Sequence, residues 1–256
     1  MFKVGLKLWN TNINDYLPLV YDLLEENIFD YIELYVVPGY TDWIPLWREV
    51  PVTYDIHAPH SAHGVDLSNN SLRHSNSSAY EEVKKYADNL NARYVICHGG
   101  VGGDIEECAR QLKSIADQRF LLENKPYKPL KFISGGRYTG CNFEEINYII
   151  DKANIGFCLD VGHSICAANS YHKEIYSFVE ELFSLQPAKI HLSDIDVGSE
   201  LDQHLNFGNG NLNFKKLDSI VNLTASDITI ETSKNSKTNL DDFVRDVFFL
   251  RKLVNE

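Results

Sequence analysis

The chain has 256 residues, with 24 Lys and Arg against 36 Asp and Glu, so its formal net charge is −12 when histidine is neutral. A hydrophobic content of 44% is enough for a sizeable core, which excludes disorder over the whole chain. The negative total also disfavours nonspecific binding to the phosphate backbone of nucleic acid, because that binding relies on a basic surface.

Cysteine spacing and the N-terminal residues indicate the cellular compartment in which the protein is expected. The five cysteines are scattered and form no Cys-x-x-Cys pair, so the sequence predicts neither a disulfide framework nor a thiolate zinc site. Charged residues interrupt the N-terminal apolar residues before a signal-peptide core could form, and no later apolar run is as long as a membrane span. We therefore expect a cytoplasmic protein that does not enter a membrane by these routes.

Short apolar, β-branched runs alternate with amphipathic stretches along the whole chain, which predicts repeated strand–helix units. The predicted strands are residues 2–8, 31–36, 52–56, 94–97, 119–122, 155–159, 189–191 and 227–230. The clearest predicted helices are residues 16–26, 79–90, 105–115, 143–152, 173–185, 214–221 and 240–254. In the last of these, Phe243, Val247, Leu250 and Val254 recur at steps of three and four, as expected for a helix packed on a sheet.

This alternation implies parallel strands joined by helical crossovers. About eight such units in a chain of this length predict an α/β protein with one domain over residues 1–256, a single (β/α)8 TIM barrel. An open, doubly wound sheet is the structural alternative. Its dinucleotide-binding form is disfavoured, because no Gly-x-Gly-x-x-Gly follows the first predicted strand.

Histidines and carboxylates terminate most of the predicted strands, where a barrel of this kind assembles its active site. The residues at the strand ends are His57, His98, Glu123, Asp160, His191 and Glu231, and His163, Asp202 and His204 follow shortly after. Converging carboxylates repel one another, and a bound divalent cation removes that repulsion. Mixed histidine and carboxylate ligands suit zinc or manganese, and a set of nine ligands indicates a cluster rather than one ion.

Two further segments lie near these residues. The glycines of Phe207-Gly208-Asn209-Gly210-Asn211 permit either an ordinary turn or close approach of the backbone to a substrate. The segment 125–137 is basic and contains Lys125, Lys128, Lys131 and Arg137 without any acidic residue. We interpret it as either a solvated loop or an anchor for a phosphate or carboxylate that approaches the metals.

With these residues in this order, nearly the whole chain resembles the xylose isomerase-like barrel superfamily, and its metal residues are most similar to those of endonuclease IV (AP endonuclease family 2). The pieces that carry the resemblance are Ile56-His57-Ala58-Pro59, Cys97-His98-Gly99, Leu122-Glu123-Asn124, Leu159-Asp160-Val161-Gly162-His163, Ile190-His191-Leu192-Ser193-Asp194, Asp202-Gln203-His204 with Gly208-Asn209-Gly210, and Ile230-Glu231-Thr232. The resemblance implies a first metal on His57 and His98, a second on Asp160, His191 and Glu231 with Glu123 bridging the two, and a third on His163, Asp202 and His204. In that family the cluster binds a phosphodiester and activates a water molecule for an in-line displacement.

Two segments depart from the endonuclease pattern. Asn124-Lys125-Pro126-Tyr127 replaces a run of small residues, and residues 58–63 do not reproduce the segment used against the DNA minor groove. Together with the acidic total, these departures favour a small phosphorylated or sugar-like substrate over abasic duplex DNA. The first hypothesis is therefore a phosphoesterase with two or three zinc ions, or manganese, in which Glu123 and Glu231 act in catalysis and Lys125 and Arg137 bind the substrate.

Two other functions remain open. A sugar or sugar-phosphate isomerase or epimerase would need one metal on Glu123, Asp160, His191 and Glu231, with the two glutamates moving a proton to and from carbon. His57, His98, Asp202 and His204 would then be surplus to metal binding. A barrel that only binds a ligand is the third hypothesis, and the complete ligand set disfavours it.

Overall fold

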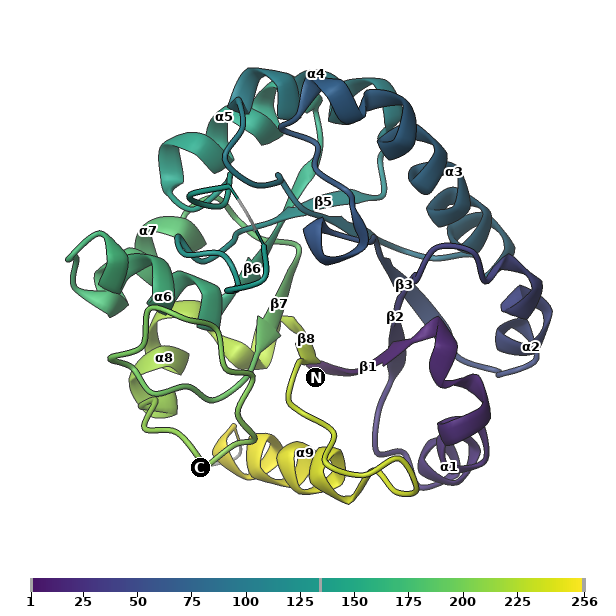
Figure 1. The fold of residues 1–256 in the computed structure, drawn as a ribbon. Helices are drawn as coiled ribbons and strands as arrows, with labels where there is room; N and C mark the ends of the chain where they lie inside the picture. The colour runs from purple at the N-terminus through teal and green to yellow at the C-terminus, as the bar shows by residue number, and fades with distance from the viewer. Residues whose placement is uncertain (1, 134, 255–256) are drawn as a thin grey trace.

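The computed structural model describes residues 2–133 and 135–254. Its parallel strands pair in chain order and close into a barrel, with β8 beside β1 (Figure 1). The strands are β1 Lys3–Trp9, β2 Tyr31–Tyr35, β3 Thr53–His57, β4 Val95–Cys97, β5 Phe120–Glu123, β6 Gly156–Asp160, β7 Lys189–Leu192 and β8 Asp227–Ile230. The predicted TIM barrel is confirmed.

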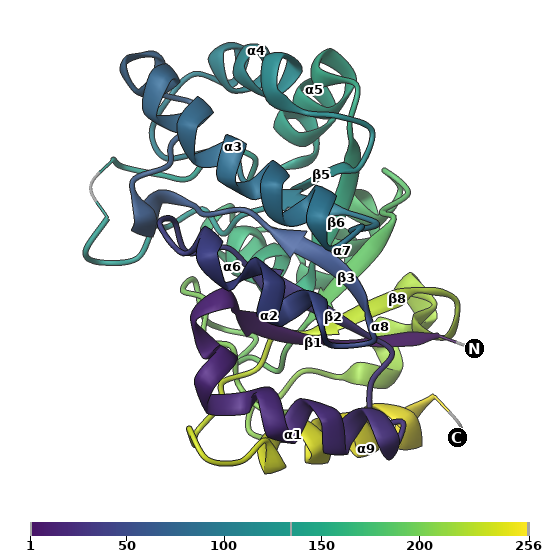
Figure 2. The ribbon, with the colours of Figure 1, turned by 90° about the vertical axis from the view of Figure 1, so that its right-hand side faces the viewer.

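Helices surround the barrel and follow the strands in sequence (Figure 1). They are α1 Ile13–Glu25, α2 Ile44–Arg48, α3 Arg73–Asn89, α4 Ile105–Ile115, α5 Phe143–Ala153, α6 Val161–Ser170, α7 Ile175–Phe183, α8 Phe214–Val221 and α9 Asp241–Leu253. Figure 2 shows α1 beside α9, with α3, α4 and α5 at the opposite end of the view. The first and last helices are therefore neighbours, as closure of the strands requires.

Besides the five-residue α2, which was not predicted, two helices differ from the sequence prediction. Helix α6 was not predicted, because residues 161–168 are all buried and the helix lacks the polar face that produces an amphipathic period. Helix α3 begins at Arg73 rather than Ala79, because residues 73–78 are polar and carry no apolar repeat. The first of these differences bears on the site, since α6 begins directly after Asp160.

The inside of the barrel is partly polar. Tyr31 lies across it against Gly5, where a Cβ atom would come within 2.4 Å of the tyrosine ring. The Lys189 ammonium is fully buried between the carboxylates of Glu33 and Asp55, which are also fully buried. The main apolar core lies instead between the strands and the surrounding helices, where Phe243, Val247 and Leu250 of α9 are buried together with side chains of every strand.

All five cysteines are buried and free, in agreement with the absence of paired spacing. Over residues 2–133 and 135–254, no helix combines the length and apolar character needed to cross a membrane.

Candidate metal centre

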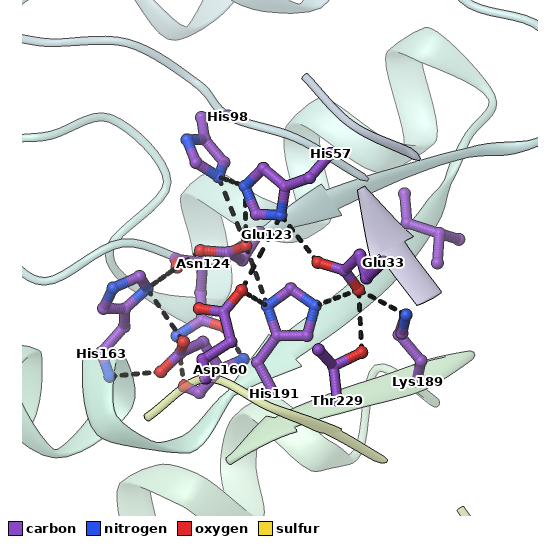
Figure 3. A network of polar contacts seen from close by, with 12 residues as sticks. Glu33, His57, His98, Glu123, Asn124, Asp160, His163, Lys189, His191 and Thr229 are labelled. Atoms are coloured by element: carbon purple, nitrogen blue, oxygen red, sulfur yellow. Dashed lines mark hydrogen bonds and ion pairs between the residues drawn. The ribbon is translucent and has the colours of Figure 1, made fainter. Parts of the chain in front are cut away.

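The nine predicted ligands lie at the C-terminal end of the barrel. His57, Glu123 and Asp160 are the last residues of β3, β5 and β6, and His191 lies near the end of β7. The remaining ligands follow in loops or in α6, and they are His98, His163, Asp202, His204 and Glu231. Figure 3 shows His57, His98, His163 and His191 around Glu123, so the strand ends bring side chains from distant parts of the sequence into contact.

A first group consists of His57, His98 and Glu123, whose donor atoms all lie within 4.8 Å of one another. The Nε2 atoms of the two histidines are 2.9 Å apart, and the Glu123 Oε2 atom is 3.3 Å from His98 Nε2 and 3.7 Å from His57 Nε2. All three side chains are buried. Three donor atoms therefore face one small space at the floor of the barrel mouth.

A second group is formed by His163, Asp202 and His204. The Asp202 Oδ2 atom lies 3.2 Å from His163 Nε2 and 2.6 Å from His204 Nε2. Asp160 caps the start of α6 by accepting a 2.7 Å hydrogen bond from the backbone N–H of His163. The strand-to-helix junction therefore fixes the positions of Asp160 and His163 together.

Glu123 connects the groups. Its Oε1 atom is 3.1 Å from His163 Nδ1, and its Oε2 atom is 3.1 Å from His191 Nδ1. Glu231 Oε1 lies 3.2 Å from the same His191 nitrogen. Two further groups of donor atoms lie within 4.8 Å of one another, one of Glu123, Asp160 and His163 and one of Glu33, His57, His191 and Glu231. Glu123 thus lies between the groups, and its role as a bridging ligand stays a prediction from the family resemblance.

These residues fit a divalent cation. Glu123 Oε2 and His191 Nδ1 are buried and close together, yet neither atom has a hydrogen-bond partner. A buried carboxylate oxygen and a buried imidazole nitrogen without hydrogen-bond partners are costly, and an ion bound between the two atoms removes that cost. Mixed imidazole and carboxylate donors suit zinc, so both the chemistry and the unsatisfied atoms favour metal binding.

Negative charge also accumulates at the site. Burial, reinforced by the charges of Glu123 and Glu231, raises the pKa of Asp160 to about 6. Burial lowers the pKa of His163, but the carboxylates of Asp160 and Asp202 outweigh burial and raise it to about 10. Protons therefore compensate part of the converging carboxylate charge, and bound cations would take over that role.

A cavity of about 460 Å³ opens above the ligands. Its walls include the aromatic side chains of Trp9, Tyr16 and Tyr35. It is also lined by four ammonium groups, those of Lys7, Lys125, Lys128 and Lys234. The volume lies in the usual range for a small-molecule site, and the lysines favour an anionic occupant.

The two predicted substrate anchors differ in position. Lys125 lines the cavity, with its Nζ atom 3.5 Å from Glu123 Oε1. Arg137 does not line it, because its guanidinium forms a 2.6 Å ion pair with Glu145. We therefore remove Arg137 from the substrate-binding set. In the same basic segment, Lys128 lines the cavity while paired with Glu200.

Comparisons with known proteins show the family. The model of the xylose isomerase-like TIM barrel family matches residues 22–253. The chain belongs to this family. A probable endonuclease 4 of Thermoplasma volcanium is 26% identical over 169 residues, which cover 60% of this chain and 58% of that protein.

Solved structures in this family share the fold. A D-tagatose 3-epimerase-like protein superimposes with a TM-score of 0.76 at 21% identity, covering 99% of this chain and 98% of that one. A structure of the IOLI protein with a zinc atom has a TM-score of 0.69 at 13% identity and the same coverage of each chain. The relatives thus include both a probable endonuclease and an epimerase-like protein, and one of them contains zinc.

The glycine-rich loop after β7 forms a turn around Asp194. The backbone N–H groups of Gly208 and Gly210 donate to Asp194 Oδ2 at 2.8 and 2.9 Å. Neither glycine lines the cavity. Of the two interpretations of this motif, the structure shows the turn, which follows the segment that carries Asp202 and His204.

Three functionally placed residues were missed by the sequence analysis. Asn124 exchanges hydrogen bonds with the backbone of Asp160, donating at 2.9 Å and accepting at 2.8 Å. Lys7 Nζ lies 2.7 Å from Glu33 Oε1 and also contacts Glu231. The available signal for Lys7 and Glu33 was a charged residue inside an otherwise apolar strand, which indicates a partner inside the barrel.

Proposed function

We propose that the chain is a metal-dependent phosphoesterase acting on a small phosphorylated compound. The observation that carries this proposal is the presence of four linked groups of donor atoms rather than one. Neighbouring groups share His57, Glu123 or His163, so the groups form a continuous cluster. The groups are Glu33, His57, His191 and Glu231; His57, His98 and Glu123; Glu123, Asp160 and His163; and His163, Asp202 and His204.

The ligand roles follow the resemblance to endonuclease IV. By that resemblance, His57 and His98 would hold one ion, and Asp160, His191 and Glu231 a second, with Glu123 shared. The contacts of Glu123 and Glu231 with His191 Nδ1 support the second set. His163, Asp202 and His204 would hold a third. Zinc or manganese bound there would polarise the phosphoester and lower the pKa of a water molecule. The protein contributes a buried, preformed donor set that needs little rearrangement.

Lysines that line the cavity would bind the phosphate. Lys125 is buried beside Glu123, so its charge is screened only weakly by water. Lys234 donates to the carbonyl oxygen of Thr232 at 3.2 Å and forms no ion pair with any residue in 2–133 or 135–254. Burial lowers the pKa of Lys234 to about 8. An anion bound beside this side chain would stabilise its charged ammonium form.

Cavity size and charge support a small substrate. The opening of about 460 Å³ suits a compact compound, and Trp9, which is 49% exposed, offers an aromatic face for its organic part. A net charge of −12 opposes the approach of a duplex with its dense phosphate charge. Abasic duplex DNA is therefore the less favoured substrate in this proposal.

Hydrolysis of p-nitrophenyl phosphate and bis(p-nitrophenyl) phosphate, with zinc or manganese added to metal-free protein, tests the proposal. Asp202→Asn removes a ligand that only a multinuclear site needs, and we expect it to lower turnover at least about tenfold. Asp196→Asn changes an exposed residue of the same loop and serves as the control. Absence of metal-stimulated hydrolysis of both compounds would contradict the proposal.

An epimerase or isomerase of sugars is the second candidate, and a specific observation favours it. Glu123 and Glu231 both line the cavity, and both face His191 Nδ1, at 3.1 and 3.2 Å. One ion among these residues would leave two glutamates near a bound sugar, as a proton shuttle requires. Asp202→Asn separates the candidates, because a one-metal epimerase would keep its turnover in this variant.

A further inference from the structure

The carboxylate of Glu33, on β2, is the most heavily bonded group beneath the metal centre. It is fully buried. Its Oε1 atom lies 2.7 Å from Lys7 Nζ and 2.8 Å from His57 Nδ1. Its Oε2 atom contacts a further set of donors, which are Lys189 Nζ, His191 Nε2 at 2.9 Å and Thr229 Oγ1 at 2.8 Å. Figure 3 shows Glu33 between the His57 and His191 rings.

Two of these contacts are to predicted metal ligands. His57 comes from β3 and His191 from β7, and the two rings stack with centroids 5.7 Å apart. Glu33 contacts the edge of each ring that faces away from Glu123. The opposite nitrogens, His57 Nε2 and His191 Nδ1, then face Glu123 Oε2. One carboxylate thus aligns ligands from two strands that are distant in sequence.

We infer that Glu33 is a positioning residue that orients His57 and His191 for metal binding and fixes the proton of His191 on Nε2. A histidine that donates its Nε2–H to Glu33 must present a bare Nδ1 to the metal. His191 Nδ1 is buried and has no hydrogen-bond partner, as this arrangement requires. The ammonium groups of Lys7 and Lys189 lie against the Glu33 carboxylate and hold it in place in the barrel interior.

Asp55 provides a matched control for a purely structural role. It pairs with Glu33 in the strand register, is fully buried and shares Lys189 as a partner, at 2.8 Å. Its other partner is Arg93, and it contacts none of the nine predicted ligands. Replacing either carboxylate by an amide removes one buried charge beside Lys189. Only the change at Glu33 also alters the contacts with His57 and His191.

Zinc affinity, measured by competition with a chelating dye, is the first test. We expect Glu33→Gln to weaken zinc binding about tenfold to hundredfold, while Asp55→Asn changes it by less than about twofold. Thermal unfolding of both metal-free variants monitors folding. Equal effects of the two variants on zinc affinity would overturn the inference, because burial of charge alone would then explain both.

A second measurement uses the unmodified chain and does not depend on the variants folding. Long-range ¹H–¹⁵N correlation spectra of the zinc-loaded protein report which imidazole nitrogen carries the proton. We expect His191, assigned through correlations of its ring to its own backbone, to carry the proton on Nε2 and to bind zinc through Nδ1. A proton on Nδ1 would overturn the inference.

This inference rests on the metal site of the proposed function, but not on its reaction. Zinc is the only probe, so no substrate enters the tests. If the unmodified chain binds no zinc, both proposals fail. If it binds zinc and hydrolyses phosphoesters while Glu33→Gln behaves like Asp55→Asn, only the role of Glu33 is wrong.

Discussion

The Nε2 atoms of His57 and His98 lie 2.9 Å apart, although the two residues end different strands. Two imidazole nitrogens at this distance can share at most one proton, or both can direct lone pairs at one ion. Glu123 Oε2 lies 3.3 Å from the His98 nitrogen and completes a buried set of three donors. The contact between His57 and His98 joins donors from two strand ends, and the proposed first metal site depends on it.

Loss of His98 should remove one metal equivalent. We expect His98→Ala, purified without chelator, to contain about one divalent ion fewer per chain than the unmodified protein, because its group retains only two donors. Elemental analysis measures the difference. His74→Ala replaces an exposed histidine of α3 and should leave the metal content unchanged. Equal metal content in the two variants would show that the group of His57, His98 and Glu123 does not bind a metal ion.

Removal of Lys125 should weaken substrate binding. Lys125→Ala eliminates an ammonium that lines the cavity, and the lost charge-assisted contact corresponds to a rise in KM of about tenfold to hundredfold for a phosphate monoester. Steady-state kinetics separate this effect from a change in kcat. Lys131→Ala, in the exposed part of the same segment, is the control. A fall in kcat with unchanged KM would instead place Lys125 in the chemical step.

Addition of a methyl group at Gly210 should destabilise the loop after β7. A Cβ atom there would lie 2.4 Å from both Asp194 Oδ1 and the carbonyl oxygen of Ile195. We expect Gly210→Ala to lower the free energy of unfolding by about 1–3 kcal/mol. At Gly198, in the same loop, a Cβ atom would meet only Asp196 Oδ1, at an ordinary 3.6 Å. Urea unfolding should show little change in the free energy of unfolding for Gly198→Ala. Equal losses of stability in Gly198→Ala and Gly210→Ala would refute the packing argument.

Acid should reduce the contribution of Glu107 to stability. Hydrogen bonds from the Arg73 guanidinium, with help from Gln111, lower the pKa of Glu107 to about 2. An unfolded glutamate titrates near pH 4.3, so the stabilisation is complete above about pH 5 and is lost as the pH falls toward 2. Glu107→Gln should therefore be less stable than the unmodified chain at pH 6, and the difference should shrink at pH 3.

Urea unfolding at the two pH values measures this change. Glu106→Gln, an exposed neighbour on α4, is the control. A difference between Glu107→Gln and the unmodified chain that stays constant from pH 6 to pH 3 would show that the Arg73 contact does not set the ionisation of Glu107.

The barrel and its ligand positions could be predicted from the sequence, because both depend on local patterns. Apolar runs that end in a polar residue mark the strands, and parallel strands bring those ends together, so His57, Glu123 and Asp160 could be placed before any coordinates. Helix α6 could not be predicted, since burial on all sides removes the periodic signal.

Long-range pairing accounts for the other differences. Arg137 forms an ion pair with Glu145. The sequence spacing of these two residues does not show whether the guanidinium pairs with a carboxylate or faces a cavity. Lys7 and Glu33 lie inside apolar strands, and their roles depend on partners from other strands. Contacts between side chains of different strands can be identified only from the structure of the closed barrel.

Anomalous diffraction at the zinc absorption edge, from crystals grown with zinc and without chelator, tests the multinuclear site most directly. The account predicts two or three anomalous peaks beneath the cavity, with one between His57 and His98 and one shared by Asp160, His191 and Glu231. A single peak that leaves His57, His98, Asp202 and His204 without metal, even at saturating zinc, would contradict the cluster and favour a one-metal epimerase.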